Sequence, residues 1–183
     1  MTFIGKMLGT ALFGTLFAAA PAMAQTINTD NDQTVNFLKY RTYTVQKVHA
    51  TDPAVEGRML IALNRDLASK YLNQSSKAPD LIITIVESNK DAQEYSSFYD
   101  GLKPLPPQRS WGSNGFFDST AAVTDIPPGT LVLDMYDAKT QRLVWRGMAT
   151  APVSASTDKN DQTMEKLVDK LISKFPPKAG KKS

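Results

Sequence analysis

The chain has 183 residues, a formal net charge of +3 and no cysteine. This length suits one domain around one hydrophobic core, and the nearly balanced charge gives no reason to expect binding to nucleic acid or to an anionic membrane. The lack of cysteine excludes disulfides, thiolate zinc sites and cysteine nucleophiles.

The first 24 residues have the pattern of a cleaved secretory signal peptide. Residues 1–6 carry one positive charge, residues 7–20 are almost all apolar or small, and an A-x-A pattern ends at Ala24, which places cleavage before Gln25. The apolar run is too short to span a bilayer, although an uncleaved N-terminal anchor is the alternative interpretation. We expect a periplasmic or secreted mature chain with no transmembrane span and, without a cysteine, no lipid anchor.

The first part of the mature chain predicts a strand and a helix. Residues 25–33 are polar and are expected to be a flexible lead-in. Residues 34–45 are rich in β-branched and aromatic residues, which favours a first strand with an irregularity near Leu38. Asp52 and Pro53 then form a strong helix start, and apolar residues at helical spacing continue to about Leu72.

The next strand leads into the least regular part of the sequence. Residues 80–86 form a nearly continuous apolar run, which predicts a central strand. Residues 88–128 are rich in glycine, proline and aromatic residues, and this segment is long for a structureless loop. Either it extends the sheet with short strands packed on the body, or its aromatics form an exposed binding rim or flap. The candidate partner-binding residues are Tyr95, Phe98, Tyr99, Trp111, Phe116 and Phe117.

Residues 129–147 give the clearest hairpin signal in the chain. Leu131, Leu133 and Met135 alternate with more polar positions, and the segment from Asp137 supplies a polar turn. Trp145 on the returning strand is the expected cross-strand cover of the apolar face. Asp134, on the opposite face, is expected to point towards water.

A helix and a basic tail complete the chain. Apolar residues at helical spacing predict a final helix over residues 158–175, ended by Pro176, and residues 178–183 are expected to be a disordered basic tail. Residues 34–177 therefore form a single α+β domain. We expect a two-layer sandwich, with a mostly antiparallel sheet of four or more strands and two helices on one face.

Several segments share a characteristic order and spacing: 40–43, the helix from Pro53, 79–83, 129–134, 137–140, 144–147 and 174–177. Together they resemble the family called domain of unknown function 4136. The resemblance extends from about residue 35 to residue 177 and implies a bacterial envelope protein with an α+β domain. Many members of that family are lipoproteins, and no catalytic or ligand-binding residue is established for it. This sequence departs from the family by its missing lipobox cysteine and at Val45 and Gln141, where an aromatic residue and a glycine are common.

The sequence offers little support for catalysis. His49 is the only histidine and is expected in a surface loop, with no G-x-S-x-G motif around any serine. We expect no cofactor and no metal site. Carboxylates remain, and Asp80 and Asp134 would approach each other only if their strands are neighbours.

The leading hypothesis is an exported, non-catalytic domain that binds or supports another envelope component. Its partner would be an unknown envelope protein or cell-surface component, reached through the sheet face or residues 88–128. The alternative hypothesis is a periplasmic hydrolase that uses carboxylates near Asp134.

Overall fold

The computed structural model describes residues 25–50, 52–88 and 126–177. The described strands form one sheet in the order β1-β6-β5-β4-β2-β3, in which β2 is parallel to β3 and β4 and the other pairs are antiparallel. The elements are β1 (Thr26–Asn31), the 3-10 helix η1 (Phe37–Lys39), β2 (Thr42–His49), α1 (Pro53–Ser69), β3 (Asn73–Gln74), β4 (Leu81–Ser88), β5 (Thr130–Asp137), β6 (Arg142–Thr150) and α3 (Thr157–Ser173).

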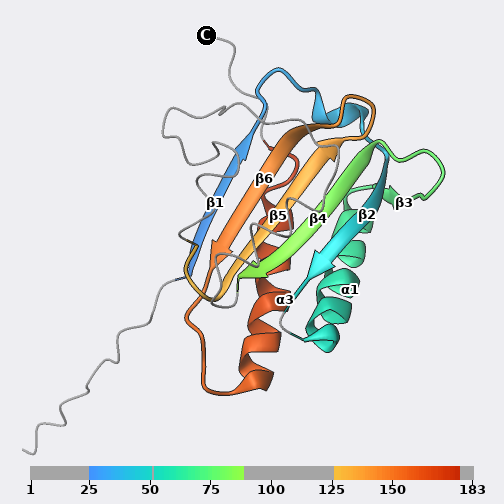
Figure 1. The fold of residues 1–183 in the computed structure, drawn as a ribbon. Coiled ribbons are helices and arrows are strands. Elements are labelled where there is room, and N and C mark those ends of the chain that lie inside the picture. The colour runs from blue at the N-terminus through green and yellow to red at the C-terminus, as the bar shows by residue number, and fades with distance from the viewer. Residues whose placement is uncertain (1–24, 51, 89–125, 178–183) are drawn as a thin grey trace, which may run out of the picture.

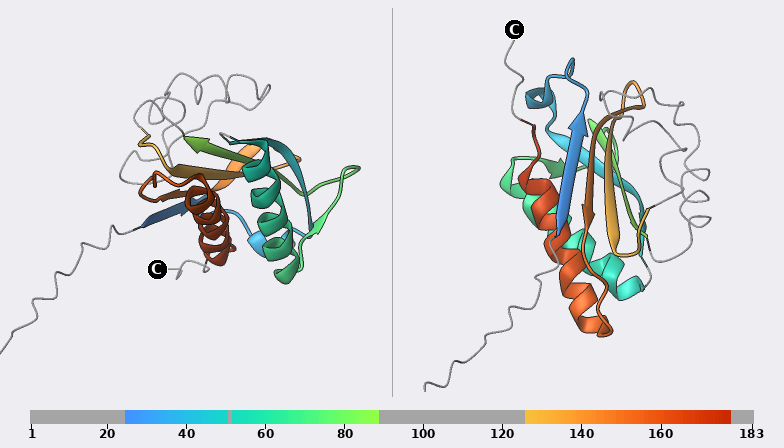
Figure 2. Two further views of the ribbon diagram at one scale, coloured as in Figure 1. Left: turned by 90° about the horizontal axis from the view of Figure 1, so that it is seen from below. Right: turned by 90° about the vertical axis from the view of Figure 1, so that its left-hand side faces the viewer.

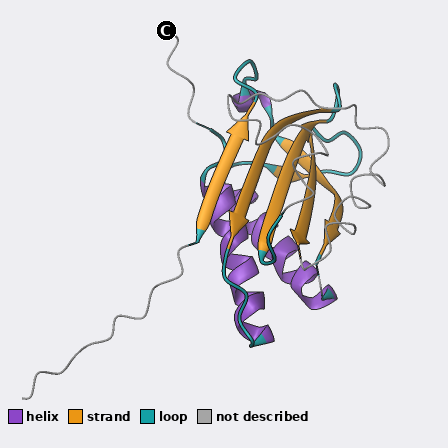
Figure 3. Cartoon of the chain, turned by 60° about the vertical axis from the view of Figure 1, so that its left-hand side comes forward, coloured by secondary structure: helices purple, strands orange, loops and turns teal. Residues whose placement is uncertain are grey.

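Both helices pack side by side against one face of the twisted sheet (Figure 1, Figure 2). This arrangement confirms the predicted α+β two-layer sandwich with a mostly antiparallel sheet. Figure 3 shows the two layers from the side on which β1 lies. Within the described residues, neither helix has the length and apolar character needed to cross a membrane.

Helix α1 begins where the sequence predicts it. The Asp52 carboxylate accepts a hydrogen bond from the Ala54 N–H at 2.7 Å, and Pro53 occupies the first turn, where its missing N–H is no loss. The helix ends at Ser69, a little before the expected Leu72. Its core-facing side consists of Val55, Met59, Ala62, Leu63 and Leu67.

Helix α3 brings the second apolar stripe onto the same face of the sheet. Its buried apolar residues are Met164, Leu167, Val168, Leu171 and Ile172. Just beyond the helix, the ring of Phe175 packs edge-on against Trp145, with ring centroids 5.6 Å apart. The expected helix is therefore confirmed, with its last turn ending at Ser173.

The β5–β6 hairpin lies in the middle of the sheet, and its face assignments are confirmed. Met135 pairs with Trp145 across the hairpin, and both side chains are fully buried on the helix side. Gly147 lies opposite Leu133, and a Cβ atom there would come within 2.5 Å of the Trp145 ring. The indole therefore fills the space that a larger residue at position 147 would need.

Two expectations for the N-terminal part are wrong. Residues 26–31 of the expected flexible lead-in are strand β1, and each pairs in register with β6. The expected strand over residues 34–45 instead contains η1, and β2 begins only at Thr42. The irregularity in β2 lies between Val45 and Lys47 and not near Leu38. Polar β1 residues gave no strand signal because an edge strand needs no apolar alternation, only a neighbour to pair with.

Candidate functional site

The face of the sheet turned away from the helices, here called the second face, carries most of the buried polar chemistry. Side chains alternate along a strand, and residues directly opposite on neighbouring strands share a face. Because Leu133 and Met135 point to the helices, Val132, Asp134 and Tyr136 point to the second face. Figure 1 views the sheet from this side, with both helices behind it.

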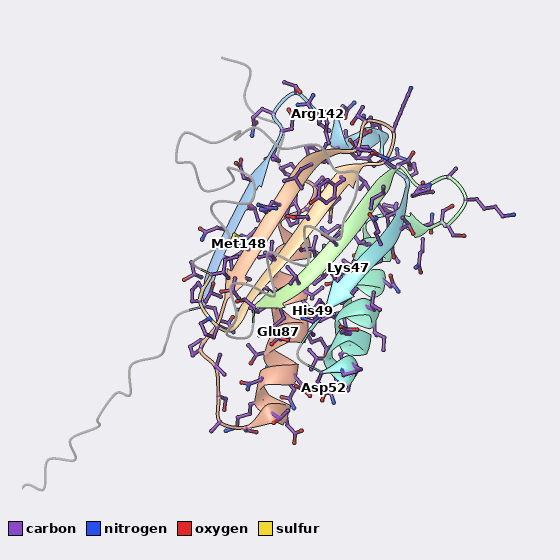
Figure 4. The ribbon with its side chains drawn as sticks, viewed as in Figure 1. Lys47, His49, Asp52, Glu87, Arg142 and Met148 are labelled. Atoms are coloured by element: carbon purple, nitrogen blue, oxygen red, sulfur yellow. The ribbon has the colours of Figure 1, made fainter. Side chains whose placement is uncertain are left out.

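Five polar residues form one row across the second face, the polar row. Lys47 lies opposite Thr84, Thr84 opposite Asp134, Asp134 opposite Arg146, and Arg146 opposite Asp30. The row therefore crosses β2, β4, β5, β6 and β1 in order. Figure 4 labels Lys47 near one side of this face and Met148, a neighbour of the row on β6, near the other.

An ion pair forms the centre of the polar row. Arg146 donates from Nε to Asp134 Oδ1 and from Nη2 to Asp134 Oδ2, both at 2.6 Å, and Tyr136 donates its hydroxyl to Oδ2 at 3.3 Å. Asp134 is fully buried and Arg146 is 5% exposed. The planar guanidinium matches the carboxylate in a two-pronged contact, which is among the strongest hydrogen-bonded pairings in proteins.

The expectation that Asp134 faces water is therefore wrong. The sequence rule considered one strand only, whereas the adjacent strand supplies Arg146 as a buried partner for the carboxylate. The conditional approach of Asp80 and Asp134, which required neighbouring strands, is not observed either. Although β4 and β5 are neighbours, the register places Thr84 opposite Asp134, while Asp80 precedes β4 near the hairpin turn.

Two atoms of the polar row lack a hydrogen-bond partner among the described residues. They are Thr84 Oγ1 and Asp30 Oδ2, and both are buried. Thr84 is 1% exposed, so its hydroxyl is removed from bulk water as well. Such groups destabilise a fold unless something satisfies them. The polar row therefore has a hydrogen-bonded ion pair, Asp134–Arg146, at its centre. Beside it, Thr84 and Asp30 each have a buried oxygen without a partner among the described residues.

A second polar cluster joins the hairpin turn to the N-terminal segment. Asp137 Oδ1 accepts from the N–H of Thr140 at 2.9 Å, which confirms its role as the turn residue. Asp137 Oδ2 accepts from Lys39 Nζ at 3.0 Å and from the Tyr40 hydroxyl at 2.9 Å. This cluster ties η1 and the residue after it to the β5–β6 turn.

Burial and the hydrogen bonds of this cluster shift the pKa values of Asp137 and Tyr40. Burial alone would raise the pKa of Asp137, but donation from the Thr140 backbone, Lys39 and Tyr40 holds that pKa well below its ordinary value of 3.8. The pKa of Tyr40 is raised above its ordinary value of 10.0 by burial and by its hydrogen bond to the Asp137 carboxylate. Asp137 thus remains a charged anchor, which suits structure better than proton transfer.

The remaining candidates contribute no recognisable reaction centre. His49 is the last residue of β2 and is half-buried, so the expectation of a loop histidine is wrong. In the described part of the chain, no group of three or more histidine, aspartate or glutamate residues is arranged to hold a metal ion. The polar row was not predicted, although charged residues at alternating positions of apolar strands are the signal that would have found it.

The predicted partner-binding aromatics lie in residues 89–125, outside the described residues, and so does Ala24. They are Tyr95, Phe98, Tyr99, Trp111, Phe116 and Phe117. Of the predicted cleavage pair only Gln25 is described, directly before β1, where its side-chain oxygen accepts a hydrogen bond from Lys170 of α3.

Comparison with known proteins identifies the fold and the family. A family model described as "Domain of unknown function (DUF4136)" matches residues 27–177, which confirms the resemblance seen in the sequence. The fold is similar to that of a DUF4136 family protein from Bacteroides thetaiotaomicron, with a TM-score of 0.58 and 14% identity over 83% of this chain and 96% of that chain. It is also similar to a PDZ domain protein from Parabacteroides distasonis, with a TM-score of 0.52 and 15% identity over 84% of this chain and 36% of that chain. The search of curated proteins gave no match.

Proposed function

Because this chain belongs to the DUF4136 family of domains of unknown function, we propose that it acts as an exported, non-catalytic domain that binds or supports another component of the bacterial envelope. The observation that carries the non-catalytic part is the Asp134–Arg146 pair. Both carboxylate oxygens accept from one guanidinium in a buried position. Neither oxygen is placed as a nucleophile or a base, so the hydrolase hypothesis gains no support.

The position of the first strand supports export. Cleavage before Gln25 would remove the apolar leader and leave β1, which begins at Thr26, intact in the sheet. The family match begins at residue 27, so the predicted cleavage also lies outside the matched domain. A signal peptide that ends directly before the first strand can be removed without loss of any ladder pair.

Export is tested by fractionation of bacteria that express the chain, followed by mass spectrometry of its N-terminus. We expect a periplasmic or secreted product that begins at Gln25. Replacing Ala22 and Ala24 with arginine should block cleavage of the leader, because signal peptidase requires small residues at those positions. Ala19→Leu, which keeps the apolar character of the leader, is the matched control. A full-length chain that stays in the cytoplasm would refute export.

Binding is tested by crosslinking in cells and recovery of the crosslinked partners. Replacing Phe98, Tyr99, Trp111 and Phe116 with serine should abolish recovery of the partner if the aromatic segment binds it. Leu38→Ser is the control, because Leu38 is an apolar side chain of η1 that is 72% exposed and lies outside the aromatic segment in the sequence. Thermal unfolding must show that both proteins remain folded. Absence of any recovered partner for the unmodified protein would reject the binding role.

A further inference from the structure

Strand β1 has an open edge in the described part of the structure. It pairs only with β6, and the Asp32 N–H donates to the Val144 carbonyl at 3.0 Å, immediately beyond that ladder. Because antiparallel ladders alternate, the even-numbered residues of β1 direct their backbone groups to β6. The backbone groups of Ile27 and Thr29 therefore point outward, with no partner among the described residues.

The edge lacks several of the devices that protect sheet edges from pairing, and its one charged residue is Asp30, which belongs to the polar row on the second face. Its sequence, TINTDN, contains no proline and no lysine, and all six residues pair with β6 without a bulge. Edges of natural sheets are usually blunted by such features unless they are covered or used. A regular edge strand, here with three of its six residues exposed, is a template for an added strand.

Helix α3 and the residue after it carry a row of lysines, here called the lysine flank, and one of them, Lys170, contacts Gln25 directly before β1. The acidic and basic residues of α3 lie on different sides of the helix. The acidic side faces α1, where Asp161 contacts Arg58 at 3.4 Å and Glu165 contacts Arg65 at 3.6 Å. The lysines lie on another side and form no ion pair in the described structure. The lysine flank consists of Lys159, Lys166, Lys170 and Lys174, all exposed.

The hydrogen bond from Lys170 to Gln25 locates the lysine flank at the start of β1. Lys174 lies one helical turn further along, and Lys166 one turn before. A strand added outside β1 would present alternate side chains to the helix layer, where these ammonium groups lie. Anionic side chains at those alternate positions would complement the flank, and cationic ones would be repelled.

We propose that the β1 edge accepts an extended acidic segment of a partner protein as an additional strand, with alternating carboxylates directed at the lysine flank. This inference rests on the proposed binding role and adds a surface and a partner chemistry to it. A second copy of this chain fits less well. Pairing two β1 edges about a two-fold axis would direct both lysine flanks at each other on the same face of the joined sheet.

The test uses the purified protein and a short synthetic peptide in which threonine and glutamate alternate. We expect binding by calorimetry, together with slower hydrogen exchange at the Ile27 and Thr29 amides. A peptide with glutamine in place of glutamate should bind about tenfold more weakly, because it loses the charge pairs. Binding should also weaken when added salt shortens the Debye length from about 10 Å to about 3 Å.

Two protein variants test separately how the β1 edge and the lysine flank contribute to peptide binding. Thr29→Pro removes an outward N–H without removing a bond to β6, so the fold should persist while peptide binding falls by about tenfold or more. The double variant Lys170→Gln/Lys174→Gln should reduce binding about tenfold. Lys77→Gln, an exposed lysine in the loop between β3 and β4 at the far edge of the sheet, is the control and should bind as the parent does.

The outcomes separate this inference from the proposed function. Equal binding of the glutamate and glutamine peptides, or unchanged binding by folded Thr29→Pro, overturns the acidic-strand inference. If crosslinking in cells still recovers a partner, the proposed binding role stands even though the acidic-strand inference has failed. Concentration-dependent dimers that Thr29→Pro abolishes would assign the edge to a second copy and also overturn the inference.

Discussion

Arg146 holds Asp134 with two hydrogen bonds of 2.6 Å at the centre of the sheet, although neither side chain faces the helix-side core. Taking both charges out of water is costly, so the pair stabilises the fold only because its geometry is close to ideal. The Tyr136 hydroxyl adds a third donor to the same carboxylate. Removing one partner would leave a buried charge.

We expect Arg146→Met to lower the free energy of unfolding by about 3–5 kcal/mol. The double variant Asp134→Val/Arg146→Met should recover most of that loss, because neither charge is then stranded. Arg142→Met is the matched control: Arg142 is 60% exposed and lies 3.5 Å from Asp32, so its loss should change stability by about 1 kcal/mol or less. Urea unfolding measures all three, and a double variant as unstable as the single one would contradict the interpretation.

The Asp137 cluster predicts loss of stability in acid. The pKa of Asp137 in the folded protein lies below its ordinary value of 3.8, so its stabilising effect is complete above that value and is lost as the pH falls through the lower folded-state pKa. Asp137→Asn should be less stable at neutral pH and should show a shallower decline below pH 3.8. Unfolding titrations at a series of pH values check this, with Asp158→Asn as an exposed charge control.

Two non-glycine residues adopt left-handed backbone conformations. Gln141 has a φ of 54° in the hairpin turn, and Tyr71 has a φ of 63° after α1. Each Cβ in this region costs roughly 1 kcal/mol, so Gln141→Gly and Tyr71→Gly should each raise stability by about 0.5–1 kcal/mol. Tyr71 is 83% exposed, so little buried area is lost. A fall in the melting temperature of both variants would contradict this account.

Replacing Gly147 and Gly57 with alanine should have opposite effects on the stability of the protein. A Cβ at Gly147 would lie 2.5 Å from the Trp145 ring and 2.8 Å from Leu171, so Gly147→Ala should destabilise the protein by about 1–3 kcal/mol. A Cβ at Gly57, in α1, meets nothing within 4 Å. Gly57→Ala should therefore stabilise the helix by about 0.5–1 kcal/mol. Thermal unfolding of the two variants side by side measures both effects.

The elements that could be predicted were those with strong local signals. The Asp52 cap, the apolar run of β4 and the alternation around Leu133 depend on residues close together in the chain, and each was placed correctly. Strand β1 and the pairing of Asp134 depend on β6, which is remote in sequence from β1 and supplies the partner of Asp134. No local pattern reports such a partner.

The site was predicted less well than the fold for the same reason. Register decides which residues meet across a sheet, and it aligned Asp134 with Thr84 and not with Asp80. The position of Asp137 could be inferred because a turn residue acts on its own neighbours, yet its contacts with Lys39 and Tyr40 come from a distant segment.

The pairing of the first strand with the last has a consequence for the order of folding. Thr26 pairs with Thr150, so the sheet closes only after nearly the whole domain has left the ribosome. Until then, β1 has no strand to pair with, and Asp134 in the polar row lacks Arg146. A nascent chain of this topology therefore stays incompletely folded for most of its synthesis, which would suit the export proposed above because a narrow translocation channel admits only an unfolded polypeptide.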